Sequence, residues 1–339
     1  MGGVWGDSLT YPPGPRLIHK FRHRSLGIRS CPSVRSGDTP LVRPPDETLQ
    51  VLLYDVFTDR PFAGNPLAVV IDPPALLDGQ MQRVAQELNL SETIFLTADG
   101  DHSFRARIFT PTTELAFAGH PTVGAALALA DEGRIDGRVV LQEGVGPVEV
   151  TLDGGIATLT TPRSPVAVAT ADPGEVMAAI GLDLGDLHPE LGPRGWSVGV
   201  PFTIVALRDL STLGRAGLDL ARWRQSLQYT DAPDLYLLAP LDGTRGERWR
   251  ARMFGPHVGV AEDPATGAAA AAACGYLAGV AGNGRLADGW IIEQGVEMGR
   301  PSEITVTPAL RGSEIVGVRI GGRAVRVGTG TLAIPPTEG

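Results

Sequence analysis

The sequence predicts an α/β (α+β) protein made of two similar domains, and three observations lead to this prediction. The chain has 339 residues, which corresponds to two domains at about 150 residues each. Short β-rich runs alternate with segments of helical spacing along most of its length. Two distant stretches also share the same pieces of sequence in the same order, which indicates an internal duplication.

Residues 1–47 differ from the rest of the chain. They carry seven Lys or Arg residues against four Asp or Glu residues, a net charge of +3, whereas the whole chain has a formal charge of −9. The stretch is rich in proline and lacks apolar periodicity, so we expect a disordered basic tail or an over-long gene start. A targeting peptide is the alternative, although no apolar core for secretion is present. We expect an N-terminal domain at 48–165, a crossover at 166–195 and a C-terminal domain at 196–335.

The N-terminal domain begins with two β-rich runs between Gln50 and Ile71, joined by turn residues. A segment of helical spacing follows at Gln80 to Leu90, and a helix of small residues is expected at Pro121 to Glu132. The other strands expected in this domain are 94–96, 104–109, 138–141, 148–152 and 156–160.

In the second part of the chain a short helix is expected near Gly174 to Ile180, inside the crossover. A second helix of small residues is expected at Pro264 to Val280. The strands expected there are 203–207, 235–239, 250–254, 304–308, 315–320 and 324–327.

The duplication rests on two matched pieces of sequence. Arg107-Ile108-Phe109-Thr110-Pro111 corresponds to Arg252-Met253-Phe254-Gly255-Pro256. Each is followed, after a short loop, by Pro-x-x-Gly-Ala-Ala, at 121–126 and at 264–269. Because both pieces lie in a strand–loop–helix context, they predict two α/β domains related by a pseudo-twofold axis. Coincidence in an Ala- and Gly-rich chain is the alternative.

Composition excludes several classes of function. The acidic chain lacks the basic field that nucleic acid or an anionic membrane attracts, and no apolar run is long enough to span a membrane. Lys20 is the only lysine, so the folded part offers no Schiff-base or P-loop lysine. Cys31 and Cys274 make no disulfide framework, and no metal-site spacing or dinucleotide fingerprint is present. We therefore expect a cytoplasmic protein that works by acid–base chemistry on side chains, without cofactor or metal.

Both repeats place a residue suited to acid–base chemistry at a small-residue helix: His120 in the first repeat and Asp263 in the second. Each helix is expected to have proline in its first turn, where the missing N–H costs nothing. Two helix starts that face each other across a cleft would hold an anionic ligand with their free N–H groups. Because histidine ordinarily has a near-neutral pKa, His120 is a candidate for carrying protons. Asp263 by itself is also explained as an N-cap.

Glu92 lies in Leu90-Ser91-Glu92-Thr93-Ile94, between an expected helix and an apolar strand. A carboxyl drawn into apolar surroundings has a raised pKa and can act as acid and base near neutral pH. An exposed glutamate, or a capping interaction with Ser91, is the alternative.

Motifs along most of the chain resemble those of the PhzF family, named for the phenazine-biosynthesis isomerase. They run in order from about residue 50 to 334 and leave out the basic tail. The motifs are Asp55-Val56-Phe57, Gly64 to Val69, Leu88 to Glu92, Arg107 to Pro111, Glu114-Leu115, Phe117 to Pro121, Arg252 to Phe254, Glu262-Asp263, Ala265 to Gly267, Gln294 to Ser302 and Gly328 to Thr331.

The resemblance implies a diaminopimelate-epimerase-like fold: two similar domains, each a mostly antiparallel curled sheet around a central helix, with the active site between them. It implies a cofactor-independent isomerase that acts on a small carboxylate, and a homodimer. Glu92 would be the proton shuttle, as in the conversion of trans-2,3-dihydro-3-hydroxyanthranilate, with His120 and Asp263 assisting. Substrate contacts are carried over to Ser91, Gly119, Gly267 and Ala268.

One position departs from the family pattern, because Ala268 stands where the family often has Ser. A lost hydroxyl removes a hydrogen bond worth about 0.5–1.5 kcal/mol, which is enough to change the preferred substrate. An amino-acid epimerase is one alternative, although the two thiols that such enzymes place at the helix starts are replaced by His120 and Asp263. A carboxylate-binding protein without turnover is the other.

Overall fold

The structure, a computed structural model, describes residues 48–241, 247–279 and 289–337. All of them belong to one compact unit, Pro44–Gly339. The expected basic tail at 1–47 lies outside the described residues. Among the helices described, none is both long and apolar enough to cross a lipid bilayer.

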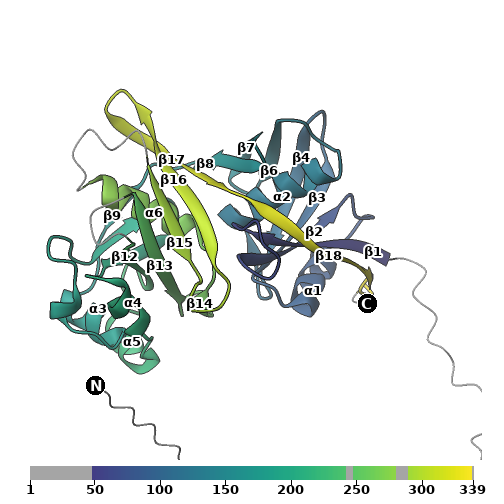
Figure 1. Cartoon of the computed structure of the whole chain (residues 1–339). Helices are drawn as coiled ribbons and strands as arrows, with labels where there is room; N and C mark the ends of the chain where they lie inside the picture. Colours follow the sequence, from purple (N-terminus) through teal and green to yellow (C-terminus); the bar gives the residue numbers. More distant parts are fainter. Residues whose placement is uncertain (1–47, 242–246, 280–288, 338–339) are drawn as a thin grey trace, which may run out of the picture. The chain divides into compact units, whose positions relative to one another are not determined.

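The N-terminal half is a mixed sheet that surrounds helix α2 (Figure 1). Antiparallel pairs predominate, and β2–β3 and β4–β6 are the parallel pairs in this half of the described chain. Its elements are β1 (Thr48–Val56), β2 (Asn65–Ile71), α1 (Asp78–Leu88), β3 (Glu92–Ala98), β4 (Ser103–Phe109), β5 (Glu114–Leu115), α2 (Gly119–Asp131), β6 (Arg138–Glu143), β7 (Gly146–Asp153) and β8 (Ile156–Thr160).

The C-terminal half repeats this order around helix α6. Strands β11 and β12 are parallel, as are β13 and β15, which matches β2–β3 and β4–β6 in the first half. Its elements are β9 (Val166–Val168), α3 (Pro173–Ala179), the 3-10 turn η1 (Leu184–Asp186), β10 (Arg194–Ser197), β11 (Pro201–Ala206), α4 (Leu210–Arg215), α5 (Leu220–Ser226), β12 (Asp234–Pro240), β13 (Arg248–Gly255), β14 (Val260–Asp263), α6 (Gly267–Ala278), β15 (Trp290–Gln294), β16 (Ser302–Arg311) and β17 (Glu314–Gly322).

The duplication extends to single side chains. Arg107 on β4 binds both carboxylate oxygens of Glu114 at 2.7 Å, and its guanidinium lies 5.1 Å from the centre of the Phe109 ring. Arg252 on β13 binds both oxygens of Glu262 at 2.8 and 2.9 Å and lies 4.9 Å from the Phe254 ring. These are the arginines that the sequence comparison aligned, so the predicted pair of related halves is confirmed.

The sheet of each half includes a strand that comes, in the sequence, directly after the repeat forming the other half. Strand β9 comes after the first repeat and pairs with β10 in the second half. Strand β18 (Ala324–Ala333) comes after the second repeat and pairs with β1 along its whole length, as Figure 1 shows. Strands β8 and β17 also pair with each other. The expected domain boundaries at 165 and 196 stay a prediction.

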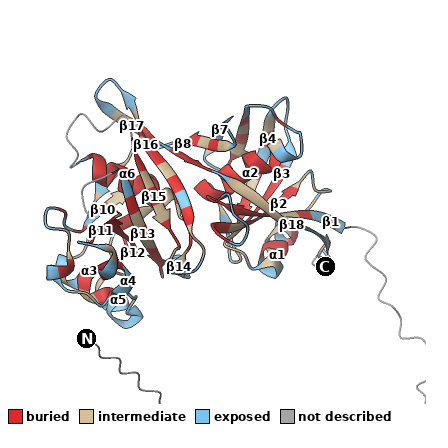
Figure 2. Cartoon of the chain, viewed as in Figure 1, coloured by how far each residue is buried: buried red, intermediate tan, exposed pale blue. Residues whose placement is uncertain are grey.

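Both central helices are buried on all sides (Figure 2). A helix can be enclosed in this way only when its side chains are small and apolar, because the surrounding strands then approach it closely. In α2 a methyl group added at Gly124 would lie 2.4 Å from a Leu67 carbon. The two small-residue helices expected from the sequence are confirmed.

The second matched piece of sequence is not structurally equivalent in the two halves. Pro121 is the third residue of α2, whereas Pro264 lies three residues before α6 begins at Gly267. The expectation that proline occupies the first turn of both helices is therefore wrong for α6. Helices α4 and α5, which flank the path from β11 to β12, were not expected from the sequence because they are short and carry little periodicity.

Candidate active site

The N-termini of the two central helices meet at the junction of the two halves. Gly119 begins α2 and Gly267 begins α6, and a methyl group added at Gly119 would lie only 3.6 Å from the Gly267 Cα. Within the part of the chain that the structure describes, no side chain caps the first N–H groups of either helix. Free N–H groups and the positive ends of both helix dipoles therefore converge, as expected for a site that holds an anion.

Glu92 is the first residue of β3 and lies next to this junction. The chain turns from α1 into β3 at Asn89, whose left-handed conformation (φ 49°) suits asparagine. The Glu92 side chain is 17 % exposed, yet its Oε2 atom has no hydrogen-bond partner among the described residues. Burial, followed by the nearby charge of Asp263, raises the pKa of Glu92 to about 8. This direction agrees with the interpretation of Glu92 as a carboxyl group in apolar surroundings.

His120, the second residue of α2, faces this carboxyl group. Its Nδ1 atom lies 3.2 Å from Glu92 Oε2, and its Nε2 atom has no hydrogen-bond partner among the described residues. Burial lowers the pKa of His120 to about 3, against a smaller opposite effect of the Pro66 carbonyl. The expected near-neutral pKa is therefore wrong, because burial disfavours the imidazolium ion. Neutral imidazole can still relay a proton, since one nitrogen donates while the other accepts.

Asp263 ends β14 and is held by side chains on both of its oxygens. Asn65 Nδ2 donates to Asp263 Oδ1 at 3.0 Å, and the Thr266 hydroxyl donates to Oδ2. Thr266 is the N-cap residue of α6, so the alternative that Asp263 caps this helix is wrong. Burial raises the pKa of Asp263 to about 6, while the bonds from Thr266 and Asn65 lower it. Asp263 is thus a fixed acceptor, in contrast to Glu92.

A buried glutamine supports this arrangement. Gln294 Nε2 donates to the Asp263 carbonyl at 2.8 Å and to Thr266 Oγ1 at 3.0 Å. Its Oε1 atom accepts bonds from Thr266 N and the Tyr236 hydroxyl. Sequence reasoning assigned no role to Asn65, Thr266 or Gln294. The available signal was that all three lie in the motifs shared with the PhzF family.

The other predicted residues lie around the same junction. Ser91 is half-buried and directly precedes Glu92, and Ala268 is the half-buried second residue of α6. A methyl group added at Gly119 would lie 3.8 Å from the Ala268 nitrogen. Cys274 is enclosed inside α6, and burial raises the pKa of its thiol well above the usual range. Among the described residues, no three His, Cys, Asp or Glu side chains are placed to hold a metal ion.

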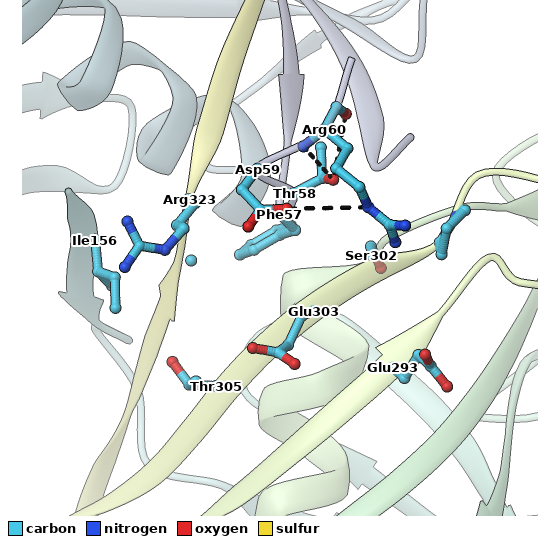
Figure 3. A pocket seen from close by; sticks show the side chains of 12 residues that line it. Phe57, Thr58, Asp59, Arg60, Ile156, Glu293, Ser302, Glu303, Thr305 and Arg323 are labelled. Carbon is cyan, nitrogen blue, oxygen red and sulfur yellow. Dashed lines mark hydrogen bonds and ion pairs between the residues drawn. The ribbon is translucent and has the colours of Figure 1, made fainter. Parts of the chain in front are cut away.

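A separate cavity of about 190 Å³ lies behind Phe57 (Figure 3). Its lining includes loop 57–60 and, at the start of β16, Ser302, Glu303 and Thr305, but none of the predicted site residues. The Phe57 ring joins the two regions, because a methyl group added at Gly267 would lie 3.5 Å from it. Two acidic side chains of the lining are already paired, Glu293 with Arg250 and Glu303 with Arg248.

Comparison with known proteins agrees with this architecture. The PhzC-PhzF family, described as phenazine biosynthesis-like protein, matches residues 54–330. The chain belongs to this family. The PhzF resemblance and the diaminopimelate-epimerase-like fold that it implied are therefore confirmed.

Individual relatives span almost the whole folded part. An uncharacterized isomerase of Mesorhizobium japonicum is 40% identical over 304 residues, covering 85% of this chain and 100% of that protein. The trans-2,3-dihydro-3-hydroxyanthranilate isomerase of Pseudomonas aeruginosa is 36% identical over 289 residues, covering 82% and 97%. The crystal structure of a PhzF-family protein from Bacillus anthracis matches with a TM-score of 0.75 at 26% identity, covering 84% and 99%.

Proposed function

We propose that this PhzF-family protein is an isomerase that moves a proton between two carbons of a small carboxylated ring compound. Trans-2,3-dihydro-3-hydroxyanthranilate is the first candidate substrate, because a relative 36% identical to the chain is named for that reaction. The proposal assigns the chemistry to side chains alone, with Glu92 as the group that carries the proton.

The observation that carries the proposal is the contrast between two neighbouring carboxyl groups. Asp263 has both oxygens engaged by fixed donors, whereas Glu92 Oε2 and His120 Nε2 have no hydrogen-bond partner among the described residues. Buried polar atoms are nearly always paired, so two unpaired atoms on side chains that contact each other are best explained as groups that bond to a substrate. Glu92 and His120 lie beside the N-termini of two helices, whose free N–H groups can bind the carboxylate of the substrate.

The proposed reaction needs no group other than these. Ionised Glu92 takes a proton from the ring carbon that carries the hydroxyl, and the electron pair of the broken C–H bond spreads into the adjacent diene. The Glu92 carboxylic acid then returns the proton to another carbon of the same conjugated system. One C–H bond breaks and one forms, so the product is an isomer. Asp263 and neutral His120 orient the substrate by hydrogen bonds.

Racemisation by two thiols is disfavoured by the described residues. His120 is the second residue of α2, Asp263 lies four residues before α6 begins, and Cys274 is buried within α6 with a raised thiol pKa. A thiol of this kind is inert as a base, because burial disfavours the thiolate.

The test is turnover of trans-2,3-dihydro-3-hydroxyanthranilate in D2O by the full-length protein and two variants. We expect the wild type to form product that contains deuterium, and Glu92→Gln to lose about 10²- to 10⁴-fold in kcat. Glu143→Gln is the matched control, because Glu143 is also buried with a pKa raised to about 8 but lies outside the site.

Each outcome decides a separate part of the proposal. Full activity of folded Glu92→Gln would remove Glu92 from the chemistry. Absence of turnover by folded wild-type protein would reject this substrate, and ligand binding without deuterium uptake would favour a carboxylate-binding protein.

A further inference from the structure

The loop between β1 and β2 has an unusual backbone conformation that contacts with the C-terminal half help to hold. Phe57, Phe62 and Gly64 have φ angles of 63°, 64° and 60°, in the left-handed region. Such angles cost phenylalanine about 1–2 kcal/mol each. A bond from Phe62 N to Asp55 Oδ2 at 2.6 Å within this segment, together with contacts from outside it, offsets that cost. Phe57 bonds through its backbone to Arg323 and Glu303 of the C-terminal half, and Figure 3 shows it above the strand that carries Glu303.

Arg300, in the turn between β15 and β16, closes the other end of this loop. Its Nη2 atom donates to Asp55 Oδ1 at 2.5 Å and to the Ala63 carbonyl at 2.8 Å, and its Nε atom donates to the Gly64 carbonyl at 2.9 Å. Only a planar guanidinium presents donors in the fork that these acceptors require. The Asp55 side chain is 4% exposed, and its second oxygen accepts from the Phe62 nitrogen at 2.6 Å.

Both polar backbone groups of Gly64 are therefore hydrogen-bonded. Its carbonyl accepts from Arg300, and its nitrogen donates to the Pro301 carbonyl at 3.1 Å. Asn65 follows immediately. Its Nδ2 atom donates to Asp263 Oδ1 at 3.0 Å and to the Ala265 carbonyl at 2.9 Å, which uses both amide hydrogens. The other donor to the Asp263 carboxylate, Thr266, comes from the same segment as Asp263, so Asn65 supplies the bond that crosses between the halves.

We propose that Arg300 is a positioning residue of the site: by fixing the loop from Asp55 to Gly64, it holds the Asn65 amide on the Asp263 carboxylate. Arg300, from the C-terminal half, binds the loop of the N-terminal half. Asn65, the residue after that loop, in turn donates a hydrogen bond to Asp263 in the C-terminal half. The role of Asp263 in turnover rests on the proposed function, but its hydrogen bond to Asn65 does not.

The test measures the pKa of the Asp263 carboxyl directly, by NMR titration of protein labelled with ¹³C in the aspartate carboxyl groups. All variants carry Glu92→Gln, which removes the coupled titration of the neighbouring carboxyl, and Asp263→Asn assigns the signal. The variants are Arg300→Lys, Asn65→Ala and the two together. Arg134→Gln is the control, because Arg134 also pairs with one carboxylate, Asp72, but within the N-terminal half.

Loss of a hydrogen bond to the ionised form raises the pKa of a carboxyl group. We therefore expect Arg300→Lys and Asn65→Ala to raise the Asp263 pKa by similar amounts, the double variant to add nothing further, and the control to leave it unchanged. A wild-type Asp263 pKa in Arg300→Lys, or fully additive shifts in the double variant, would overturn the inference. Because no substrate is present, failure of the proposed isomerase activity does not change this result.

Discussion

His120 Nδ1 lies 3.2 Å from Glu92 Oε2, and the two side chains come from the start of a helix and the start of a strand. Because the pKa of His120 is about 3 and that of Glu92 about 8, the contact is not an ion pair near neutral pH. No hydrogen bond joins these two atoms in the structure, but a neutral imidazole can accept from a protonated carboxyl group or donate to an ionised one by changing tautomer. His120 can therefore face both protonation states of Glu92 without a change in its own charge.

The pH dependence of kcat/KM follows from these groups. In the proposed reaction Glu92 acts as a base in its ionised form, which becomes the minor form below its pKa of about 8. We expect log(kcat/KM) to rise with a slope of about 1 toward pH 8 and then to level. Below the Asp263 pKa of about 6, protonation of this second group should steepen the slope to about 2. Steady-state rates across this range test the expectation, and a rate that is highest in acid contradicts it.

Glu143 should make the folded protein less stable as the pH rises. Burial raises its pKa from 4.5 to about 8, so the folded state keeps a proton that the unfolded chain releases. The free energy of unfolding therefore falls between these two pH values, and Glu143→Gln should remove a few kcal/mol of this fall. Urea unfolding near both values measures the difference. Glu149→Gln, at an exposed position on β7, is the control. If both Gln variants changed the free energy of unfolding equally with pH, the fall would not come from Glu143.

Gly64 should tolerate substitution far less than Gly133, although both have left-handed φ angles of 60° and 66°. A methyl group at Gly64 would lie 2.2 Å from the Val56 carbonyl oxygen, whereas no atom of residues 48–241, 247–279 or 289–337 would lie within 4 Å of one at Gly133. We expect Gly133→Ala to cost about 1–2 kcal/mol of stability and Gly64→Ala clearly more. Denaturant unfolding of both variants measures this. Equal losses would mean that the loop adjusts without strain.

Ala268→Ser tests which substrate the site prefers. A hydroxyl at the second residue of α6 would lie beside the free N–H groups of the two helix starts. If it bonds to the substrate, KM for trans-2,3-dihydro-3-hydroxyanthranilate should fall by roughly 2- to 10-fold. Steady-state kinetics on the wild type and the variant measure the change, with a thermal melt to verify folding. An unchanged KM would place the substrate away from residue 268.

Local patterns in the sequence predicted much of the fold and the centre of the site. The helices of small residues were visible because both α2 and α6 consist almost entirely of residues that fit inside a curled sheet. Glu92 and His120 stood out because each is a polar residue at the edge of an apolar element. The sequence pattern did not reveal the His120 pKa, since this depends on how deeply the fold buries the imidazole.

The residues that support the site could not be found in this way. Asn65 and Asp263 are 198 residues apart, and Arg300 and Asp55 are 245 residues apart. No local periodicity links such positions, because they meet only after both halves have formed. The matched Pro-x-x-Gly-Ala-Ala pieces even suggested a wrong alignment of the two helix N-termini. Their Gly-Ala-Ala residues begin α6 in the second half but lie in the interior of α2 in the first.

The exchange of strands also has a consequence for synthesis on the ribosome. Strand β1 emerges early, but its partner β18 ends at Ala333, so at about 5–20 residues per second it waits roughly 15 to 60 s for that partner. During this interval one edge of β1 is an unpaired template for strands of other nascent chains. We therefore expect slower translation of the second half to increase aggregation of this protein, whereas a chain with β18 moved ahead of β1 by circular permutation should be less sensitive.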